Sequence, residues 1–356
     1  DFNTPDHIKE AGKKAIDDNF SKYSPVPGYM DLREAIVDKL KKENHLDYTT
    51  GEVIVGTGGK QGVCNTILAL VNPGDEVIIP APYWVSYPQM AKLAGATPVI
   101  VRAGFEQDFK MTAEQLEAAI TPKTKMLILC SPSNPTGSVY SQEELNALAE
   151  VILKHEDIFV LSDEIYEHIN YVGKAASIAS YPGMKERTII CNGVSKAYAM
   201  TGWRLGWVAA PAWIVKGINK LQGQYTSGTC DVSQKAAVAA YVASQDCVEQ
   251  MRVAFERRRD LIVKLAKDIP GLEVNVPQGA FYLFPKCSSF FGKSDGETVI
   301  NNSTDFAMYI LEKAHVATVG GDAFGDPDCF RMSYATSDDN IREAMRRIKE
   351  VLAVLK

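Results

Sequence analysis

The sequence predicts an α/β fold followed by a second, smaller α+β domain. From residue 52 to residue 210, short apolar runs alternate with segments of helical pattern, which is typical of a mostly parallel sheet sandwiched by helices. After Thr229 this alternation stops, and a long helical segment is followed by short strand candidates. The length of 356 residues and the apolar content of 46% also favour about two domains.

Seven apolar runs are predicted to be the strands of the first sheet. They are residues 52–56, 76–80, 97–102, 125–130, 159–163, 188–192 and 206–210. Two capping boxes between them, Thr112-x-x-Gln115 and Ser141-x-x-Glu144, predict the starts of amphipathic helices. After Thr229 the patterns predict, in order, helix to about residue 268, strands at 272–276, 280–284, 316–319 and 329–334, and an amphipathic helix over 338–355.

Composition and charge restrict the classes of partner and compartment. With 38 basic and 44 acidic residues, a net charge of −6 and no long run of one sign, the chain is not expected to bind nucleic acid or an anionic membrane. No apolar stretch approaches the roughly 20 residues of a membrane span, and no secretory leader is visible, so we expect a cytoplasmic protein. The first residue is Asp1 rather than methionine, which suggests that the sequence begins downstream of the translated start. The seven cysteines form no CxxC pair and are expected to be buried free thiols.

A glycine-rich segment, Gly56-Thr57-Gly58-Gly59-Lys60-Gln61-Gly62, follows a predicted strand and opens a predicted helix. Free backbone N–H groups and the positive end of the helix dipole would surround a space that glycines leave open, which favours a phosphate site. The segment matches neither standard nucleotide motif, because no Ser or Thr follows Gly59-Lys60 and the third glycine of GxGxxG is replaced by Gln61. A tight strand-to-helix turn without a ligand is the alternative.

Three more loops that follow predicted strands carry an acid, an amide and an aromatic face. Asp163 ends an apolar run, and a buried aspartate needs a cation or a donor; the alternative is that it caps the next helix. Two prolines fix the loop Ser131-Pro132-Ser133-Asn134-Pro135-Thr136-Gly137 so that the Asn134 amide points in one direction, although a plain turn would also fit. Pro82-Tyr83-Trp84 presents an aromatic face, or packs in the core.

Lys196 follows another predicted strand, in Ser195-Lys196, and Arg204 lies eight residues later. The free lysine amine has a pKa near 10.4, so attack on a carbonyl at neutral pH needs desolvation or a nearby cation. Arg204 could be that cation or could hold a phosphate, and a surface lysine before a turn is the alternative. A phosphate cradle, an aromatic face, an oriented amide, a buried acid and a lysine together describe a site for pyridoxal 5'-phosphate.

With these motifs the sequence resembles the class I, fold-type I aminotransferases, especially the bacterial aspartate aminotransferases. The resemblance runs from Asp1-Phe2-Asn3-Thr4-Pro5 to Arg331-Met332-Ser333-Tyr334-Ala335-Thr336-Ser337. It implies the fold-type I architecture of pyridoxal-phosphate transferases, with Lys196, Asp163 and Tyr166 as catalytic residues. In the family the lysine forms the Schiff base with the cofactor and shuttles the proton, and the aspartate pairs with the pyridinium nitrogen.

The resemblance also implies the remaining contacts. The cofactor phosphate would be held by Gly58, Gly59, Lys60, Ser195 and Arg204. Tyr166 and Asn134 would touch the ring hydroxyl and Trp84 would stack on the ring. Arg331 would clamp the substrate α-carboxylate through its fork geometry, with Trp84 and Asn134 nearby. Tyr23, in Lys22-Tyr23-Ser24-Pro25, would reach the phosphate of a partner subunit, so a homodimer with shared sites is expected. A cis peptide bond between Asn134 and Pro135 is expected on the same ground.

We therefore expect a large cofactor-binding domain over residues 21–255 and a small domain made of residues 1–20 and 256–356. The expected reaction is transfer of the amino group of an amino acid, first of all aspartate, to 2-oxoglutarate by a ping-pong mechanism, with no metal. Alternatives are an aromatic, prephenate or broad-specificity aminotransferase, a fold-type I lyase or synthase, and a non-catalytic ligand sensor. The preference for dicarboxylates stays open, because Leu68 stands where some relatives carry a lysine for the distal carboxylate and because a substrate-contacting glycine of the family lies upstream of this sequence.

Overall fold

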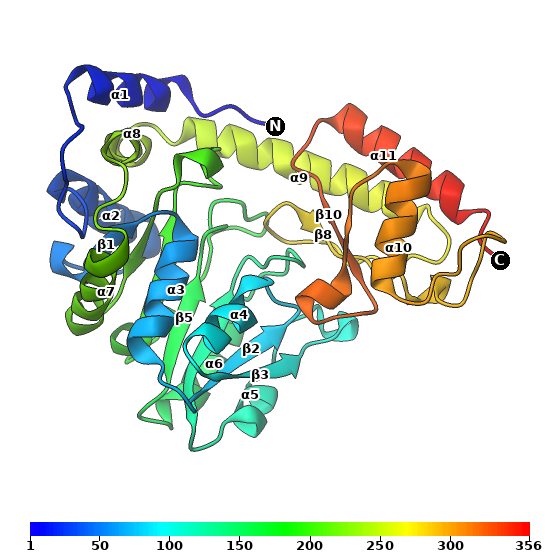
Figure 1. Ribbon diagram of the computed structural model, residues 1–356, viewed down its shortest axis with the longest axis horizontal. Helices are drawn as coiled ribbons and strands as arrows, with labels where there is room; N and C mark the ends of the chain where they lie inside the picture. The colour runs from blue at the N-terminus through cyan, green and yellow to red at the C-terminus, as the bar shows by residue number, and fades with distance from the viewer.

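The structure, a computed structural model, describes residues 1–356 and confirms the predicted α/β class (Figure 1). Its main sheet has seven strands in the order β1-β7-β6-β5-β4-β2-β3. The strands are β1 (Val53–Gly56), β2 (Glu76–Ala81), β3 (Thr97–Arg102), β4 (Thr124–Cys130), β5 (Phe159–Asp163), β6 (Thr188–Gly193) and β7 (Gly206–Ala209). All seven predicted strands are present, and no end differs from its predicted position by more than one residue.

Strand direction brings the predicted site loops to one edge of this sheet. Strands β2 to β6 pair in parallel, whereas β7 is antiparallel to both of its neighbours, β1 and β6. The carboxyl ends of the six parallel strands therefore meet at the same edge as the amino end of β7. The loops that follow β1, β2, β4, β5 and β6 consequently converge at this edge, and the loop after β6 leads directly into β7; such an edge is the usual place for a ligand site in an α/β sheet.

Helices cover both faces of the sheet because buried side chains alternate along the strands. Ile54 packs with α3 (Gly59–Leu70), α4 (Ser86–Leu93) and α7 (Ala212–Tyr225) on one face. Val53 and Val55 pack on the other face with α2 (Met30–Asn44) and α8 (Asp231–Val242). On that second face, α5 (Ala113–Ala119) and α6 (Gln142–Leu153) cover β2, β4 and β5. Both predicted capping boxes are present at the starts of α5 and α6.

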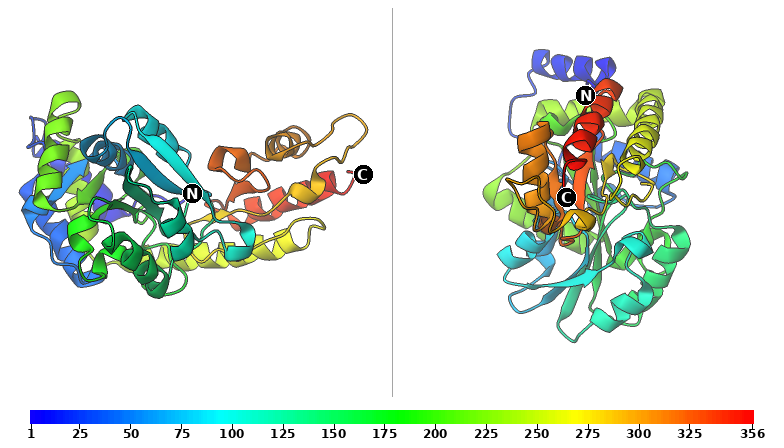
Figure 2. Two further views of the ribbon diagram at one scale, coloured as in Figure 1. Left: turned by 90° about the horizontal axis from the view of Figure 1, so that it is seen from below. Right: turned by 90° about the vertical axis from the view of Figure 1, so that its right-hand side faces the viewer.

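The C-terminal part forms a second, α+β region beside the main sheet (Figure 2). It holds a three-stranded antiparallel sheet in the order β8 (Tyr282–Leu283), β10 (Phe330–Ser333) and β9 (Val319–Gly320). The helix α9 (Asp246–Lys267) packs with α10 (Ser303–Tyr309) and α11 (Asp338–Leu352) around a core of its own, and a π-helical turn, Ile310–Ala314, follows α10. This region supplies β10, which carries Arg331.

Two of the elements predicted for the C-terminal part are corrected. The helix predicted from Thr229 to about Asp268 is two helices, because the Gln245 amide donates to the carbonyls of Ala240 and Ala243 and competes with helix continuation. Residues 272–276 form no strand, only one isolated bridge at Glu273, and Pro277 after them has no N–H for a ladder.

The remaining strands of this part are shorter than predicted. Ala280 adopts a left-handed φ of 54°, so β8 begins only at Tyr282. Strand β9 begins at Val319, β10 begins and ends one residue inside its predicted range, and α11 ends at Leu352. The predicted alternation identified where these elements lie but not how few of their residues pair.

The predicted domain division, 21–255 against 1–20 with 256–356, stays a proposal. At the N-terminus, α1 (Asp6–Asp17) packs against α8, and Phe2 packs edge-on against Phe255 of α9. None of the helices combines the length and the apolar character needed to cross a membrane. All seven cysteines are free thiols, but the expectation that they are buried is wrong for Cys230, which is exposed, and for Cys64, Cys130 and Cys247, which are half-buried.

Candidate active site

A cavity of about 340 Å³ lies where the loops of the main sheet meet the C-terminal region. This volume is within the range that holds a small cofactor or ligand. Ten of the residues predicted for the site line it, and they come from the segments that follow five strands of the main sheet and from β10: Gly59, Lys60, Trp84, Asn134, Asp163, Tyr166, Ser195, Lys196, Arg204 and Arg331. The sequence-based hypothesis of one converging site is therefore supported by the position of these side chains.

One end of the cavity is positively charged. Gly58 precedes α3 with a φ of 80°, and a Cβ atom at this position would lie 2.5 Å from Nη2 of Arg204. The glycine thus lets the guanidinium approach the N-terminus of α3, where free N–H groups point outward. Arg204 Nη1 also donates to the Thr201 carbonyl at 2.8 Å, which fixes the side chain. Lys60 Nζ lies 4.9 Å from the centre of the Trp84 ring. These groups form a site for an anion.

Asp163 supplies a buried acid to the same cavity. It ends β5 and is 7% exposed. Its Oδ2 accepts a hydrogen bond from the Tyr87 hydroxyl at 2.6 Å, and its Oδ1 accepts one from the Ile165 N–H at 3.3 Å. Burial raises the pKa of Asp163, and the hydrogen bonds and the charge of Lys196 only partly oppose this. The alternative that Asp163 caps a helix is wrong, because no helix follows it and residues 165–168 form turns.

Lys196 lies half-buried in the loop after β6. Its Nζ is 5.6 Å from the centre of the Tyr166 ring and 5.7 Å from the centre of the Phe281 ring. Burial lowers the pKa of this amine, Asp163 raises it, and the positive charges of Arg204 and Arg331 lower it further. The net pKa is below the ordinary value, so the neutral, nucleophilic form is more accessible than in a solvated lysine. The surface-lysine alternative is wrong.

Arg331 brings a guanidinium from β10 into the cavity. The group lies 4.6 Å from the centre of the Tyr282 ring and 4.8 Å from that of Phe324, and its Nη1 donates to Asn134 Oδ1 at 2.8 Å. Contacts with these two aromatic rings restrict the orientation of the planar fork. The predicted cis bond between Asn134 and Pro135 is confirmed. The Tyr166 hydroxyl is hydrogen-bonded to the Tyr282 hydroxyl at 2.9 Å.

Two predicted site residues and Leu68 lie outside the cavity lining. Gly58 lies behind the lining and acts through the space that it leaves for Arg204. Tyr23 is 99% exposed, in a surface hollow shared with residues 226–232. Its predicted contact is with a partner subunit, so its role stays a prediction. Leu68 is half-buried on α3.

Five lining residues were missed by sequence reasoning, namely Tyr87, Cys130, Ile165, Thr201 and Tyr282. Thr201 lies between Lys196 and Arg204, Ile165 lies next to Tyr166, and Cys130 ends the strand that leads into the Asn134 loop, so closeness in sequence was a usable signal. Tyr87 lies in the first turn of α4 and its contact with Asp163 bridges 76 residues. Tyr282 comes from the second region. No local pattern identifies these two.

Comparison with known proteins agrees with this geometry. The family model described as aminotransferase class I and II matches residues 1–348. A bifunctional aspartate aminotransferase and glutamate/aspartate-prephenate aminotransferase of Petunia hybrida is 50% identical over 100% of this chain and 75% of that protein. An aspartate/prephenate aminotransferase of Cereibacter sphaeroides is 49% identical over 100% of this chain and 90% of that protein.

The fold is also similar to that of a solved aminotransferase structure. The crystal structure of the aspartate aminotransferase from Rhizobium meliloti has a TM-score of 0.97 at 44% identity and covers 100% of this chain and 90% of that chain. Its likeness confirms the predicted fold-type I architecture, and the two relatives above, both named aminotransferases, favour transamination over the lyase and ligand-sensor alternatives. The chain is an aminotransferase and belongs to the aminotransferase class I and II family.

Proposed function

We propose that this aminotransferase uses pyridoxal 5'-phosphate to move the amino group of aspartate to 2-oxoglutarate by a ping-pong mechanism. The observation that carries the proposal is a single cavity lined by Lys196, Asp163, Arg204 and Arg331. The names of the relatives, which include aspartate as a substrate, support the choice of amino acid.

The chemistry of the lining residues fits this cofactor. An anion site formed by Arg204, Lys60 and the N-terminus of α3 suits the phosphate, and the close approach that Gly58 permits leaves no room for a Cβ there. The buried carboxyl of Asp163 suits a protonated ring nitrogen, and Trp84 offers a face for stacking. When bound, pyridoxal phosphate supplies a carbonyl for the lysine and a ring that withdraws electrons from the substrate Cα.

The roles of the remaining side chains follow from their charges. Gly58, Gly59, Lys60, Ser195 and Arg204 would hold the phosphate. Asp163, kept in place by Tyr87, would hold the proton at the pyridine nitrogen, because a buried carboxylate favours a neighbouring cation. Tyr166 and Asn134 would bind the ring hydroxyl, although in the structure their polar groups contact Tyr282 and Arg331.

Lys196 would act as the general base and acid at the substrate Cα. Because its pKa is lowered, the neutral amine would take up the proton from the substrate Cα and would donate it to the carbonyl-derived carbon of the cofactor. Arg331 would bind the substrate α-carboxylate with two parallel hydrogen bonds, which aligns the Cα–H bond with the amine. Both steps need only residues that line the cavity.

Prephenate is a second candidate substrate, because two relatives are named for it. Coupled assays with aspartate or phenylalanine as the amino donor, and with 2-oxoglutarate or prephenate as the acceptor, separate the candidates. We expect aspartate to give a higher kcat/KM than phenylalanine. Turnover of aspartate no better than that of phenylalanine would contradict aspartate as the main amino donor.

We also propose a cytoplasmic homodimer. The nearly complete exposure of Tyr23 supports a role outside its own protomer, and seven free thiols suit a reducing compartment. Sedimentation of the loaded protein should give twice the mass of the 39.0 kDa chain. Tyr23→Phe should weaken cofactor retention without changing that mass.

A further inference from the structure

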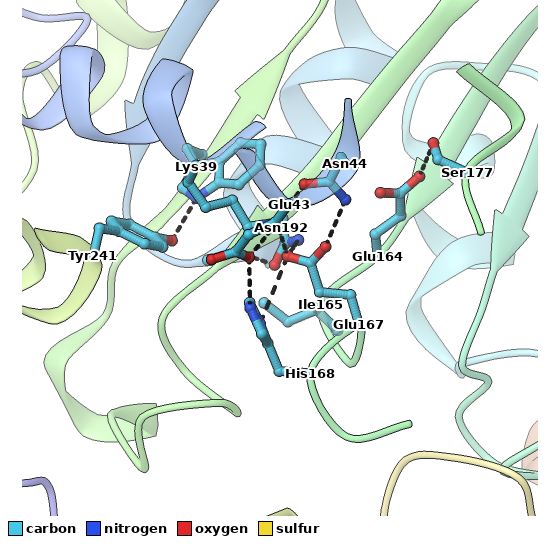
Figure 3. Close-up of polar contacts among 12 residues, drawn as sticks. Lys39, Glu43, Asn44, Glu164, Ile165, Glu167, His168, Ser177, Asn192 and Tyr241 are labelled. Atoms are coloured by element: carbon cyan, nitrogen blue, oxygen red, sulfur yellow. Dashed lines mark hydrogen bonds and ion pairs between the residues drawn. The ribbon is translucent and has the colours of Figure 1, made fainter. Parts of the chain in front are cut away.

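A network of buried and half-buried polar side chains is formed by residues that do not line the cavity (Figure 3). It joins three segments: α2, the turn after β5, and β6. Its members are Lys39, Glu43, Asn44, Glu167, His168 and Asn192. None of these side chains contributes to the cavity surface, so none is assigned a role by the proposed function.

Glu167 is the centre of this network. It accepts hydrogen bonds from Lys39 Nζ, from Asn44 Nδ2 at 2.9 Å and from Asn192 Nδ2 at 2.7 Å. Lys39 is 4% exposed and Glu167 is 7% exposed. Burial by itself would raise the pKa of Glu167, but the charges of Lys39 and His168 and the hydrogen bonds lower it to about 2. The carboxylate is therefore ionised at neutral pH and paired with a buried lysine.

Three of the members, Glu43, Glu167 and His168, are close enough together to share a cation. Lys39 already provides one, because its Nζ contacts Glu167 and lies 3.6 Å from Glu43. His168 Nε2 is 2.9 Å from Glu43 Oε2. The group is therefore an ion-pair network rather than a metal site.

The network is connected through the backbone to both halves of the catalytic machinery. Glu167 directly follows Tyr166 and lies four residues after Asp163, whereas Asn192 lies four residues before Lys196. The two segments are also joined by a hydrogen bond from the Glu164 N–H to the Cys191 carbonyl at 2.9 Å. Within the segment that leads to Lys196, the Asn192 Oδ1 accepts a hydrogen bond from the Gly193 N–H at 2.7 Å. One carboxylate thus ties the acid-bearing turn and the lysine-bearing loop to each other and to α2.

We propose that the Glu167 carboxylate, held by Lys39, is a positioning group that sets where Asp163 and Tyr166 lie relative to the Lys196 amine. A buried ion pair is a weak source of stability, since an apolar pair of similar volume does as well. Its directional hydrogen bonds can instead hold two segments in one relative position. The proposal rests on the proposed function, because this position matters for turnover only if Lys196 moves the proton.

The test compares Glu167→Gln with the matched control Glu164→Gln, in protein loaded with pyridoxal phosphate. Both residues are buried acids of the same turn, but the Glu164 carboxyl accepts from Ser162 at 2.9 Å and Ser177 at 2.6 Å, neither of which belongs to the network. For Glu167→Gln we expect kcat to fall about 10- to 100-fold with little change in KM, because Arg331 is untouched while the proton-transfer geometry is altered. Glu164→Gln should keep the wild-type values.

Two further readouts separate positioning from a general loss of folded protein. The kinetic isotope effect with Cα-deuterated aspartate should rise in Glu167→Gln, since proton transfer becomes more rate-limiting; a smaller fraction of folded enzyme would leave it unchanged. Backbone hydrogen exchange should accelerate in residues 163–168 and 192–198 but not in the glycine-rich turn at 56–62. Faster exchange in all three segments would overturn the proposal.

A double variant, Lys39→Met with Glu167→Gln, covers the case in which Glu167→Gln alone fails to fold with an unpaired buried lysine. It should fold, and it should show the same fall in kcat, rise in isotope effect and local exchange. Wild-type values of all three in the double variant would overturn the proposal. If the wild-type protein transaminates no amino acid, the proposed function fails, and the exchange experiment still decides whether Glu167 positions the two segments.

Discussion

Two lysine–carboxylate groupings lie close together in this molecule and differ in how their charges are compensated. In the cavity, Asp163 accepts hydrogen bonds from the neutral groups of Tyr87 and Ile165 rather than from Lys196. Beside the cavity, Glu167 is in direct contact with Lys39. All four side chains are buried or half-buried, so burial alone does not distinguish the two groupings.

The consequence of this difference is opposite shifts in pKa. Without a direct ion pair, burial dominates, so the pKa of Asp163 is raised and that of Lys196 is lowered. Where a direct ion pair is present, the charge of Lys39 and the hydrogen bonds have a larger effect than burial, and the pKa of Glu167 falls to about 2. Loosely compensated charges are suited to proton transfer and tightly compensated charges to holding a structure together. The comparison teaches that reactivity in this fold depends on which buried lysine is left without a direct partner.

The largest expected effect comes from making the same substitution in both groupings. Lys196→Met should lower kcat by about 10⁴-fold, because the proposed general base is lost, with no loss of stability. Lys39→Met should instead destabilise the protein by about 3–5 kcal/mol, because the Glu167 carboxylate is left buried without a cation. Transaminase assays and denaturant unfolding of both variants check this. Equal losses of stability in the two variants would contradict the comparison.

Asp163→Asn should have the next largest effect. The asparagine keeps the shape of the side chain and an acceptor for Tyr87, but it no longer provides a negative charge for the ring nitrogen. We expect kcat to fall about 10²- to 10³-fold with cofactor still bound. The measurement is the rate of a single turnover, with cofactor content read by absorbance. An equal fall in Glu164→Gln, its sequence neighbour, would show that the effect is not specific to the cavity acid.

Arg331→Lys should have a smaller effect, confined to substrate binding. A lysine cannot make the two parallel hydrogen bonds of the guanidinium, so kcat/KM should fall about 10- to 100-fold. Because every amino acid has an α-carboxylate, aspartate and phenylalanine should be affected alike. A loss seen with aspartate alone would assign Arg331 to the distal carboxylate instead.

The smallest expected effect is on the pH dependence of stability. Burial, followed by the charge of Glu167, raises the pKa of Glu164 from its ordinary value of 4.5 to about 7. The folded state therefore holds a proton that the unfolded state releases, so this residue stabilises the fold fully below pH 4.5 and the contribution is lost as the pH rises through about 7. Unfolding free energies of Glu164→Gln should decline less between these pH values than those of the wild type. A wild-type slope in the variant would contradict the raised pKa.

The sequence was sufficient to predict the cavity because its residues follow parallel strands. Strand alternation is a local pattern, and strand direction then brings Asp163, Asn134 and Lys196 to one edge without any knowledge of long-range contacts. The resemblance to a family added Arg331, which comes from the second region and is not placed by that rule. The short strands near residue 280 were poorly predicted because a left-handed residue and a proline interrupt the pairing.

The second lysine–carboxylate grouping could not be predicted in the same way. Lys39 and Glu167 are 128 residues apart, and each reads locally as a solvent-facing charge. The Tyr87 hydroxyl that contacts Asp163 is likewise brought there by tertiary packing. Charges that are paired across a core leave no periodic signal in sequence, because either partner alone fits an ordinary surface position.

The central claim, that Lys196 is the lysine left reactive in the cavity, is tested most directly by chemical trapping. Protein loaded with pyridoxal phosphate is reduced with borohydride, digested and mapped by mass spectrometry. The label is expected on the peptide that contains Lys196. A label on Lys60, the other lysine that lines the cavity, or on Lys39 would contradict the claim.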